Sequence, residues 1–235
     1  MNEFDRFKLL IGENNFNIIK NKRILIVGVG GVGGYVLETL ARSGIENITI
    51  IDNDIIDITN LNRQIISLNN NVGSNKVDVA KERILKINSK ANIKPIQAFL
   101  NKDNISILGK LKFDYIVDCC DTIETKILLI KYCLKNNIKI ISSMGAGKRL
   151  DATQVCISRL DKTFNDPLAK VIRKRLNKEH ISLKIPVVFS KETPLNIKSD
   201  VIASCSYIPA TFGLFITNYV INDIIKDYQN DNLNI

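Results

Sequence analysis

The chain has 235 residues, with 33 Lys and Arg against 24 Asp and Glu, which gives a formal net charge of +9. This length suits one sizeable α/β domain and is short for two, so we expect a single domain over residues 1–235. The positive charge favours a polyanionic partner, although a generally basic proteome would produce the same balance.

Strand and helix alternate from residue 23 to residue 143, after a helical lead-in over residues 1–22. This alternation predicts a Rossmann-like α/β fold, in which a mostly parallel sheet carries helices on both faces. The first strand is expected at residues 23–27, where a short apolar run is typical of a buried parallel strand, and a helix at residues 32–43 follows it. Further strands are expected at residues 47–51, 91–98, 113–117 and 138–142.

A glycine-rich loop joins the first strand to its helix, with Gly28, Gly30, Gly31 and Gly33 in the pattern G-x-G-x-x-G. The first glycine of this pattern permits a tight turn, the second lets the backbone approach a phosphate, and the last lets the helix pack on the strand. Asp52 ends the second strand 24 positions after Gly28, where such a unit places the acid that binds a ribose. A glycine turn without a ligand is the alternative.

Two cations follow the second strand. Arg63 lies in the run Asn60-Leu61-Asn62-Arg63-Gln64, and Lys76 lies near the start of a helix expected at residues 72–87. Arginine grips phosphate through parallel hydrogen bonds and lysine supplies a mobile point charge, so the pair suits a triphosphate better than a nicotinamide dinucleotide. Solvated surface charge is the alternative for each residue.

The strand expected at residues 113–117 runs into Asp118-Cys119-Cys120-Asp121. Carboxylates at the carboxyl end of a parallel strand lie on the ligand-binding edge of an open sheet, where Mg²⁺ is held together with substrate phosphates. Asp121 is therefore a candidate ligand for Mg²⁺. The alternative is that Asp121 caps a helix at residues 122–134.

Taken together, these motifs resemble the ubiquitin-activating-like, or ThiF-type, adenylating enzymes, and the resemblance covers about residues 1–150. It implies that Asp52 holds the ribose, that Arg63 and Lys76 hold the phosphates, that Asp121 binds Mg²⁺, and that Asp54 supports the metal. Nucleotide contacts are also implied for the remaining motif residues, which are Gly28, Gly30, Gly31, Gly33, Asn60 and Gln64. The opening segment, residues 4–12, resembles the one from which that family lends an arginine across a homodimer, here Arg6.

Within that family, residues 145–153, 166–169 and 187–192 resemble the tRNA threonylcarbamoyladenosine dehydratases. These enzymes use ATP to cyclise a threonylcarbamoyl group on the adenosine beside the anticodon, through an acyl phosphate or an acyl adenylate. The resemblance therefore implies ATP, Mg²⁺ and tRNA. One departure is a short stretch between Glu192 and Ser204.

Two other functions stay open. The first is an adenylyltransferase that activates the C-terminal Gly-Gly of a ubiquitin-like sulfur carrier, with a sulfur-carrier or cysteine-desulfurase partner. The five cysteines include no C-x-x-C pair, so the zinc site of several such relatives is not expected. The second is a nicotinamide-dependent oxidoreductase, which Arg63, Lys76 and Asp121 disfavour.

The second part of the chain, residues 151–235, is expected to face the substrate and a dimer partner. Added antiparallel strands are expected at residues 153–158 and 186–190, and an apolar core or interface helix at residues 209–225. The apolar run at 208–221 is shorter than the ~20 residues that span a bilayer, so we expect no transmembrane segment. One face of a helix after Pro167 is basic and is a candidate tRNA contact, with a solvated helix face as the alternative; it carries Lys170, Arg173, Lys174 and Lys178.

Cys205 is the candidate for a covalent carrier, and a buried, inert thiol is the alternative. The odd number of cysteines, without a secretory leader, predicts reduced thiols and a cytoplasmic protein.

Overall fold

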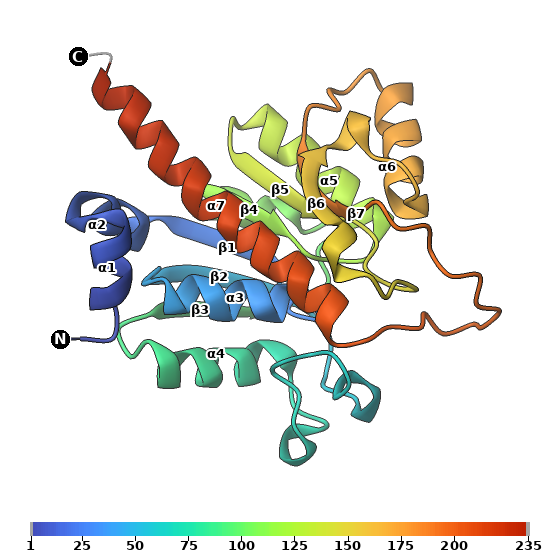
Figure 1. The fold of residues 1–235 in the computed structure, drawn as a ribbon, viewed down its shortest axis with the longest axis horizontal. Helices are drawn as coiled ribbons and strands as arrows, with labels where there is room; N and C mark the ends of the chain where they lie inside the picture. Colours follow the sequence, from blue (N-terminus) through green and yellow to red (C-terminus); the bar gives the residue numbers. More distant parts are fainter. Residues whose placement is uncertain (1, 234–235) are drawn as a thin grey trace.

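The structure is a computed structural model that describes the backbone of residues 2–233 and the side chains of residues 2–227. One sheet with the strand order β3-β2-β1-β4-β5-β7-β6 forms its centre (Figure 1). The strands are β1 (Arg23–Val27), β2 (Asn47–Asp52), β3 (Asn92–Gln97), β4 (Tyr115–Asp118), β5 (Lys139–Ser143), β6 (Val155–Arg159) and β7 (Pro186–Ser190). The helices are α1 (Asp5–Ile11), α2 (Glu13–Asn21), α3 (Gly33–Arg42), α4 (Lys76–Ile87), α5 (Ile123–Lys135), α6 (Pro167–Lys178) and α7 (Tyr207–Leu233).

Helices cover both faces of the sheet, as the alternating sequence pattern predicts. One core contains buried side chains of α2, α3, α4 and α7, and the other contains those of α5 and α6. The strands of the sheet lie between these two layers and contribute alternate side chains to each. The predicted α/β class with a mostly parallel sheet is therefore confirmed.

The two late strands differ in direction. β6 runs antiparallel to β7, as predicted, but β7 is parallel to β5, with Ser142 opposite Val187 and Ser143 opposite Val188. The expected antiparallel addition is thus confirmed for the β6–β7 pair, and β7 joins this pair to the sheet as a parallel neighbour of β5. The chain between β5 and β7 includes β6 and α6. This connection is long enough to bring the chain back so that β7 starts at the same end of the sheet as β5, as a parallel pairing requires.

Helix α4 begins at Lys76, four residues later than expected. Gly73 has a φ of +89°, which ends any helical path there. Residues 73–75 instead run beside residues 55–56, where the Ile56 N–H donates to the Ser74 carbonyl (2.8 Å) and the Gly73 N–H donates to the Ile56 carbonyl (2.8 Å). Lys76 therefore lies at the amino terminus of α4 and not inside it.

Helix α7 is longer than expected and packs along α3. A Cβ on Gly213 would lie 2.8 Å from the Val32 carbonyl oxygen, so the two helices cross in direct backbone contact. By length and composition the stretch Tyr207–Asp227 suffices to cross a membrane, but half of its most apolar window is buried inside the protein. A packed core helix meets the same criterion, and the burial supports that interpretation.

Candidate functional site

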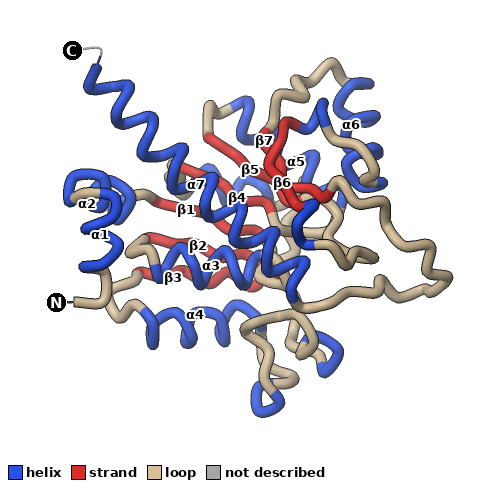
Figure 2. Tube along the Cα trace, viewed as in Figure 1, coloured by secondary structure: helices blue, strands red, loops and turns tan. Residues whose placement is uncertain are grey.

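The carboxyl ends of four parallel strands meet at one edge of the sheet. In the observed register Val27 lies opposite both Ile51 and Asp118, and Asp118 lies opposite Ser142. The segments that follow these strands therefore leave the sheet side by side, and ligands bind at this edge in open α/β folds. Figure 2 shows the long loops on this side, where residues 53–75 and 191–206 leave the strands.

The glycine loop is closely packed at two of its glycines. Gly28 has a φ of +87°, and a Cβ there would lie 2.9 Å from the carbonyl carbon of Cys119. A Cβ on Gly33 would lie 1.8 Å from the Gly28 oxygen, which only glycine avoids. Gly30 differs, because the nearest heavy atom to a Cβ there is the Gln64 Nε2 at 3.7 Å. No described neighbour requires glycine at this position, so its bare backbone leaves room for a ligand.

Asp52 connects the second strand to this loop. Its Oδ2 accepts a hydrogen bond from the Val29 N–H (2.7 Å), and its Oδ1 accepts one from the Asp54 N–H (2.9 Å). A carboxylate has about four acceptor positions. Asp52 is thus fixed beside the loop and can still accept hydrogen bonds from two hydroxyl groups.

Lys76 and Asp54 form an ion pair at the start of α4. The Lys76 Nζ lies 2.7 Å from the Asp54 Oδ2, and the Lys76 N–H donates to the Asp54 carbonyl (3.0 Å). The lysine side chain is 6% exposed, whereas the Asp54 side chain is 55% exposed. The buried ammonium therefore has a fixed position and two further protons to donate.

The segment with Arg63 lies against the glycine loop. The Arg63 Cγ lies 3.5 Å from the Cβ position of Gly31, and its Nη1 donates to the Thr59 carbonyl (2.9 Å). Asn60 is buried, and its Oδ1 accepts from the Asp57 N–H (3.1 Å), so this atom holds the turn itself.

Gln64 is buried beside Gly30, and its Oε1 has no hydrogen-bond partner among the described residues. An unpaired buried oxygen is costly. A bound group that donates a hydrogen bond would remove this cost. Gln64 thus provides a local sign that a ligand completes this site.

Asp121 is exposed on the turn after β4, and its Oδ1 lies 3.4 Å from the Thr122 Oγ1. Thr122 is the residue at the N-cap of α5, and the structure gives no side-chain cap for this helix. The helix-capping interpretation of Asp121 is therefore not supported. Among the described residues, no group of three or more His, Cys, Asp and Glu side chains forms a metal cage.

The two cysteines on this turn are unsuited to nucleophilic chemistry. Burial, together with the nearby charge of Asp118, raises the pKa of the Cys119 thiol and that of the Cys120 thiol well above their ordinary value. Both thiols are therefore neutral near pH 7, and the Cys120 thiol donates a hydrogen bond to the Asp118 Oδ1 (3.0 Å).

A buried ion pair that the sequence patterns did not reveal lies beneath the turn. Lys126 of α5 and Asp118 of β4 are both fully buried, and the Lys126 Nζ lies 3.0 Å from the Asp118 Oδ2. Burial disfavours the charged lysine, but the attraction of Asp118 outweighs it and raises the pKa of Lys126. The available sequence signal was a lysine on the apolar side of a helix.

The second-half motifs meet around Arg149, which is 2% exposed. Its Nε donates to the Gly145 carbonyl (3.0 Å), its Nη2 to the Asn165 carbonyl (3.0 Å), and its Nη1 to the Glu192 carbonyl. Asp166 accepts from the Gly145 N–H (3.0 Å). Three segments far apart in the sequence are thus fixed to one another by a guanidinium group.

This second cluster borders the nucleotide side. The Asn62 Nδ2 donates to the Ser204 carbonyl (3.0 Å), and the Lys148 N–H donates to the Ala203 carbonyl (2.8 Å). The chain before α7 therefore contacts both the Arg63 segment and the Gly145–Arg149 segment. Cys205 lies between them, with its Sγ 3.8 Å from the Arg149 carbonyl.

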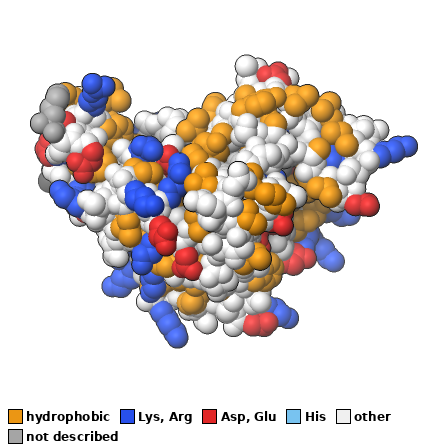
Figure 3. Space-filling model, turned by 90° about the horizontal axis from the view of Figure 1, so that it is seen from below, with side chains coloured by type: hydrophobic (Ala, Val, Ile, Leu, Met, Phe, Trp, Pro, Cys, Tyr) orange, Lys and Arg blue, Asp and Glu red, His pale blue; other side chains and the backbone are white. Residues whose placement is uncertain are grey.

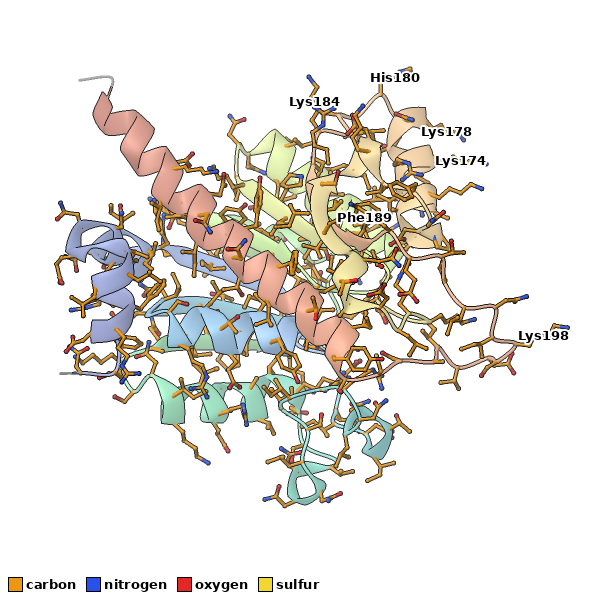
Figure 4. All side chains as sticks on the ribbon, viewed as in Figure 1. Lys174, Lys178, His180, Lys184, Phe189 and Lys198 are labelled. Atoms are coloured by element: carbon orange, nitrogen blue, oxygen red, sulfur yellow. The ribbon has the colours of Figure 1, made fainter. Side chains whose placement is uncertain are left out.

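Helix α6 presents the expected basic face in part. Lys170, Lys174 and Lys178 are exposed, and Figure 4 shows Lys174 and Lys178 pointing outward from α6. Arg173 is different, because it is half-buried and donates to the Thr163 Oγ1. The exposed cations of the predicted face are therefore the three lysines.

Two hollows, of about 640 and 550 Å³, lie at the opposite, amino-terminal edge of the sheet, and Arg23 lines both. They are shallow and far from the glycine loop along the strands. Because parallel sheets bind ligands at the carboxyl edge, we assign the site to the glycine loop and not to these hollows.

The chain is similar to known proteins over most of its length. The ThiF family model matches residues 5–174. A tRNA threonylcarbamoyladenosine dehydratase of Bacillus subtilis (strain 168) is 37% identical over 246 residues, covering 97% of this chain and 97% of that protein. One of Escherichia coli (strain K12) is 37% identical over 198 residues, covering 81% of this chain and 74% of that protein. The crystal structure of the E. coli dehydratase TcdA in complex with ATP is 33% identical, with a TM-score of 0.92 and coverage of 97% and 96% of the two chains.

Proposed function

Since the chain belongs to the ThiF family, we propose that it is an ATP-dependent tRNA threonylcarbamoyladenosine dehydratase. The observation that carries the assignment is that the likeness to dehydratases extends through the second half, where Arg149 joins the three motif segments beside the nucleotide side. The enzyme removes one water from threonylcarbamoyladenosine and leaves a cyclic product. A tRNA substrate also fits the net charge of +9. We place such an enzyme in the cytoplasm.

The residues present fit a bound ATP. The phosphates would lie over Gly30 at the amino terminus of α3, where the nearest described heavy atom to a Cβ position is the Gln64 Nε2 at 3.7 Å. Asp52 keeps acceptor positions for the ribose hydroxyls, and the unpaired Gln64 Oε1 offers an acceptor for a nucleotide group that donates. Arg63 and Lys76 would neutralise phosphate charge, the first across the loop and the second from a buried position.

A magnesium ion at Asp121 would be held by one carboxylate together with the ATP phosphates, and not by a cage of protein ligands. Mg²⁺ keeps several waters and is commonly held by one or two carboxylates together with substrate phosphates. The exposed Asp121 is free of a helix-capping bond and could supply one carboxylate. Asp54 would act in support, because its Oδ2 orients Lys76. When bound, the metal would lower the charge repulsion between the phosphates and an incoming carboxylate.

The chemistry assigned to the site is carboxylate activation. A threonyl carboxylate oxygen attacks phosphorus, which gives either an acyl adenylate with pyrophosphate or an acyl phosphate with ADP. A nucleophile of the same side group then attacks the acyl carbon, closes the ring and expels the phosphorylated oxygen. The chain contributes position and positive charge through Arg63 and Lys76, since the covalent chemistry belongs to the two substrates.

We also infer a homodimer in which Arg6 acts on the nucleotide of the partner copy. Helix α1, which carries the exposed Arg6, lies at the end of the sheet opposite to the carboxyl edge (Figure 1). Its arginine is thus placed away from the glycine loop of its own chain. Leu9 and Leu10 on the same helix are each 79% exposed, which suits burial against a second copy.

The segment between β2 and α4 provides an apolar surface against which helix α1 of a second copy could pack. The face in Figure 3, seen from below relative to Figure 1, carries broad patches of hydrophobic side chains. Exposed apolar residues of the segment between β2 and α4 include Ile55, Ile58, Leu68 and Val72. This segment also carries Arg63, so a partner docked there would lie close to the phosphates.

For tRNA we propose the three lysines of α6 as contacts to backbone phosphates. Phosphate contacts position a nucleic acid without reading its sequence. The choice of tRNA would then depend on the loop that contains residues 193–206, which borders both the nucleotide side and Arg149.

The decisive experiment is mass analysis of tRNA nucleosides after incubation with the protein, ATP and Mg²⁺. We expect threonylcarbamoyladenosine to lose one water, and Arg63→Ala and Asp121→Ala to abolish the conversion while the fold is retained. Unchanged nucleosides with the wild-type protein would refute the assignment, and full activity of both variants would refute the site. Pyrophosphate exchange that requires a Gly-Gly sulfur carrier would instead support the adenylyltransferase alternative. The release of pyrophosphate or of ADP separates the two routes of activation.

A further inference from the structure

We propose that Lys126 is a positioning residue that couples the turn at residues 119–121 to the segment at residues 144–149. The first segment carries Asp121, and the second carries Arg149. The inference deepens the proposed function, because it names the residue that connects the part of the site assigned to ATP with the part assigned to tRNA. It rests on that proposed function and on the geometry of a network whose central pair, Lys126 and Asp118, is fully buried.

The ammonium group of Lys126 bonds to the ends of two adjacent strands. Its Nζ lies 3.0 Å from the Asp118 Oδ2 at the end of β4, and 2.7 Å from the Ser143 carbonyl at the end of β5. The Ser142 Oγ is a third neighbour, at 3.4 Å. One fully buried cation therefore spans the two strands at the point where both enter the site.

Asp118 transmits this contact to the turn that carries Asp121. Its Oδ2 accepts from the Ser142 Oγ (2.5 Å), and its Oδ1 accepts from the Cys120 N–H (3.2 Å) and the Cys120 Sγ (3.0 Å). The next backbone unit, at Cys119, packs directly on Gly28, as the 2.9 Å separation from a Gly28 Cβ shows. A shift of Asp118 would thus displace both the glycine loop and the turn.

The other strand continues into the second cluster. Ser143 is followed by Met144, whose N–H donates to the Val188 carbonyl (2.8 Å), and then by Gly145, which is held by Asp166 and Arg149. The Ser143 carbonyl that accepts from Lys126 is therefore only two residues from Gly145. Position is transmitted through short, buried, hydrogen-bonded steps on each side.

A purely structural role is the weaker explanation of this ion pair. Well-packed apolar residues often replace a buried pair without loss of stability, so stability alone does not require charge here. Loss of one partner, however, leaves an uncompensated buried charge, and the surrounding backbone must move to hydrate it. At this position such a movement would reach Asp121 and Gly145 together.

The test compares Lys126→Met with Leu129→Ala in the full-length protein. Leu129 is a fully buried residue of the same helix, and its side chain has no polar atom. Both variants should be less stable, and both are assayed where urea titration shows them folded. Hydrogen exchange is measured at residues 119–121 and 144–149 without nucleotide, and ATP affinity is measured across Mg²⁺ concentrations.

We expect Lys126→Met to accelerate exchange in both segments, to lower kcat by about tenfold or more, and to raise the Mg²⁺ requirement for ATP binding. Leu129→Ala should change kcat per folded molecule by less than about twofold. Equal exchange in the two variants, or loss of protection in only one segment, would overturn the coupling.

A double variant guards against a simple loss of folding. Asp118→Asn with Lys126→Met removes both charges and should recover stability relative to Lys126→Met alone. If activity and Mg²⁺ dependence also return to wild-type values, Lys126 only compensates a buried charge and the proposal is wrong. Exchange and ATP binding need no tRNA, so these measurements stand even if the wild-type protein fails to dehydrate the nucleoside.

Discussion

Replacement of Gly30 by alanine separates packing from nucleotide binding in the glycine loop. The nearest heavy atom to the new Cβ is the Gln64 Nε2 at 3.7 Å, an ordinary van der Waals contact, and Gly30 is not among the glycines with positive φ. The described neighbours therefore give no steric reason for the substitution to destabilise the folded state. Because alanine restricts the unfolded chain, we expect the free energy of unfolding to rise by about 0.4–1 kcal/mol.

ATP binding should respond in the opposite direction. A phosphate that accepts hydrogen bonds from this backbone must lie about 2.9 Å from an amide nitrogen, and a methyl group at Gly30 would occupy that approach. Loss of one hydrogen bond to a charged group costs about 1.5–3 kcal/mol, which is about a 10- to 150-fold weaker affinity. Calorimetric titration with ATP and Mg²⁺ measures this change, and urea unfolding measures stability.

Gly109→Ala is the matched control, because a Cβ at Gly109 meets no described atom within 4 Å and the φ of Gly109, like that of Gly30, is not positive. It should leave ATP affinity unchanged. Gly33→Ala, with its 1.8 Å overlap, should instead destabilise the protein. If Gly30→Ala bound ATP as tightly as Gly109→Ala, the phosphates would not lie over Gly30 and the assigned nucleotide position would be wrong.

Three further outcomes can be checked. Arg149→Met should lower the free energy of unfolding by about 3 kcal/mol in urea titration, because buried acceptors lose a charged donor. Burial opposes ionisation of Glu38, but the hydrogen bonds from Arg83 and Arg42 outweigh burial and lower the pKa of Glu38. The charged Glu38 therefore stabilises the folded protein above about pH 4.3, and this stabilisation is lost as the pH falls through the pKa of the folded state. Glu38→Gln should therefore flatten the acid limb of a pH–stability curve. Substitution of Lys170, Lys174 and Lys178 by glutamine should weaken tRNA binding and reduce its salt dependence, with ATP affinity unchanged.

The sequence was sufficient where one residue type meets a local geometric need. The glycines, Asp52 and the strand ends follow from such needs, and the structure brings them to one edge. The start of α4 was missed because Gly73 and the pairing of residues 55–56 with residues 73–75 override helical periodicity. The direction of β7 depends on where the chain returns after α6, which a strand pattern does not encode.

Contacts between distant residues account for the remaining omissions. Arg149 was visible inside a motif, but its partners Asn165 and Glu192 are separated from it by 16 and 43 positions. Lys126 was less visible, because a lysine among apolar residues is ordinarily placed at a surface. Lys126 receives its acceptors only where the ends of β4 and β5 approach α5.

The junction of β4 and β5 separates the proposed nucleotide side of the site from the segments that Arg149 holds together. Gly28, Asp52 and the turn after β4 depend on the first half of the sheet, whereas the path after Ser143 is fixed by Arg149, Asp166 and β7. Chemistry at the phosphates can therefore stay constant while the chain after Ser143 changes the substrate, in keeping with function that resides in sites carried by a shared fold. A chain in which the residues after Ser143 are exchanged for those of another ThiF-family protein should still bind ATP. It should no longer dehydrate threonylcarbamoyladenosine in tRNA.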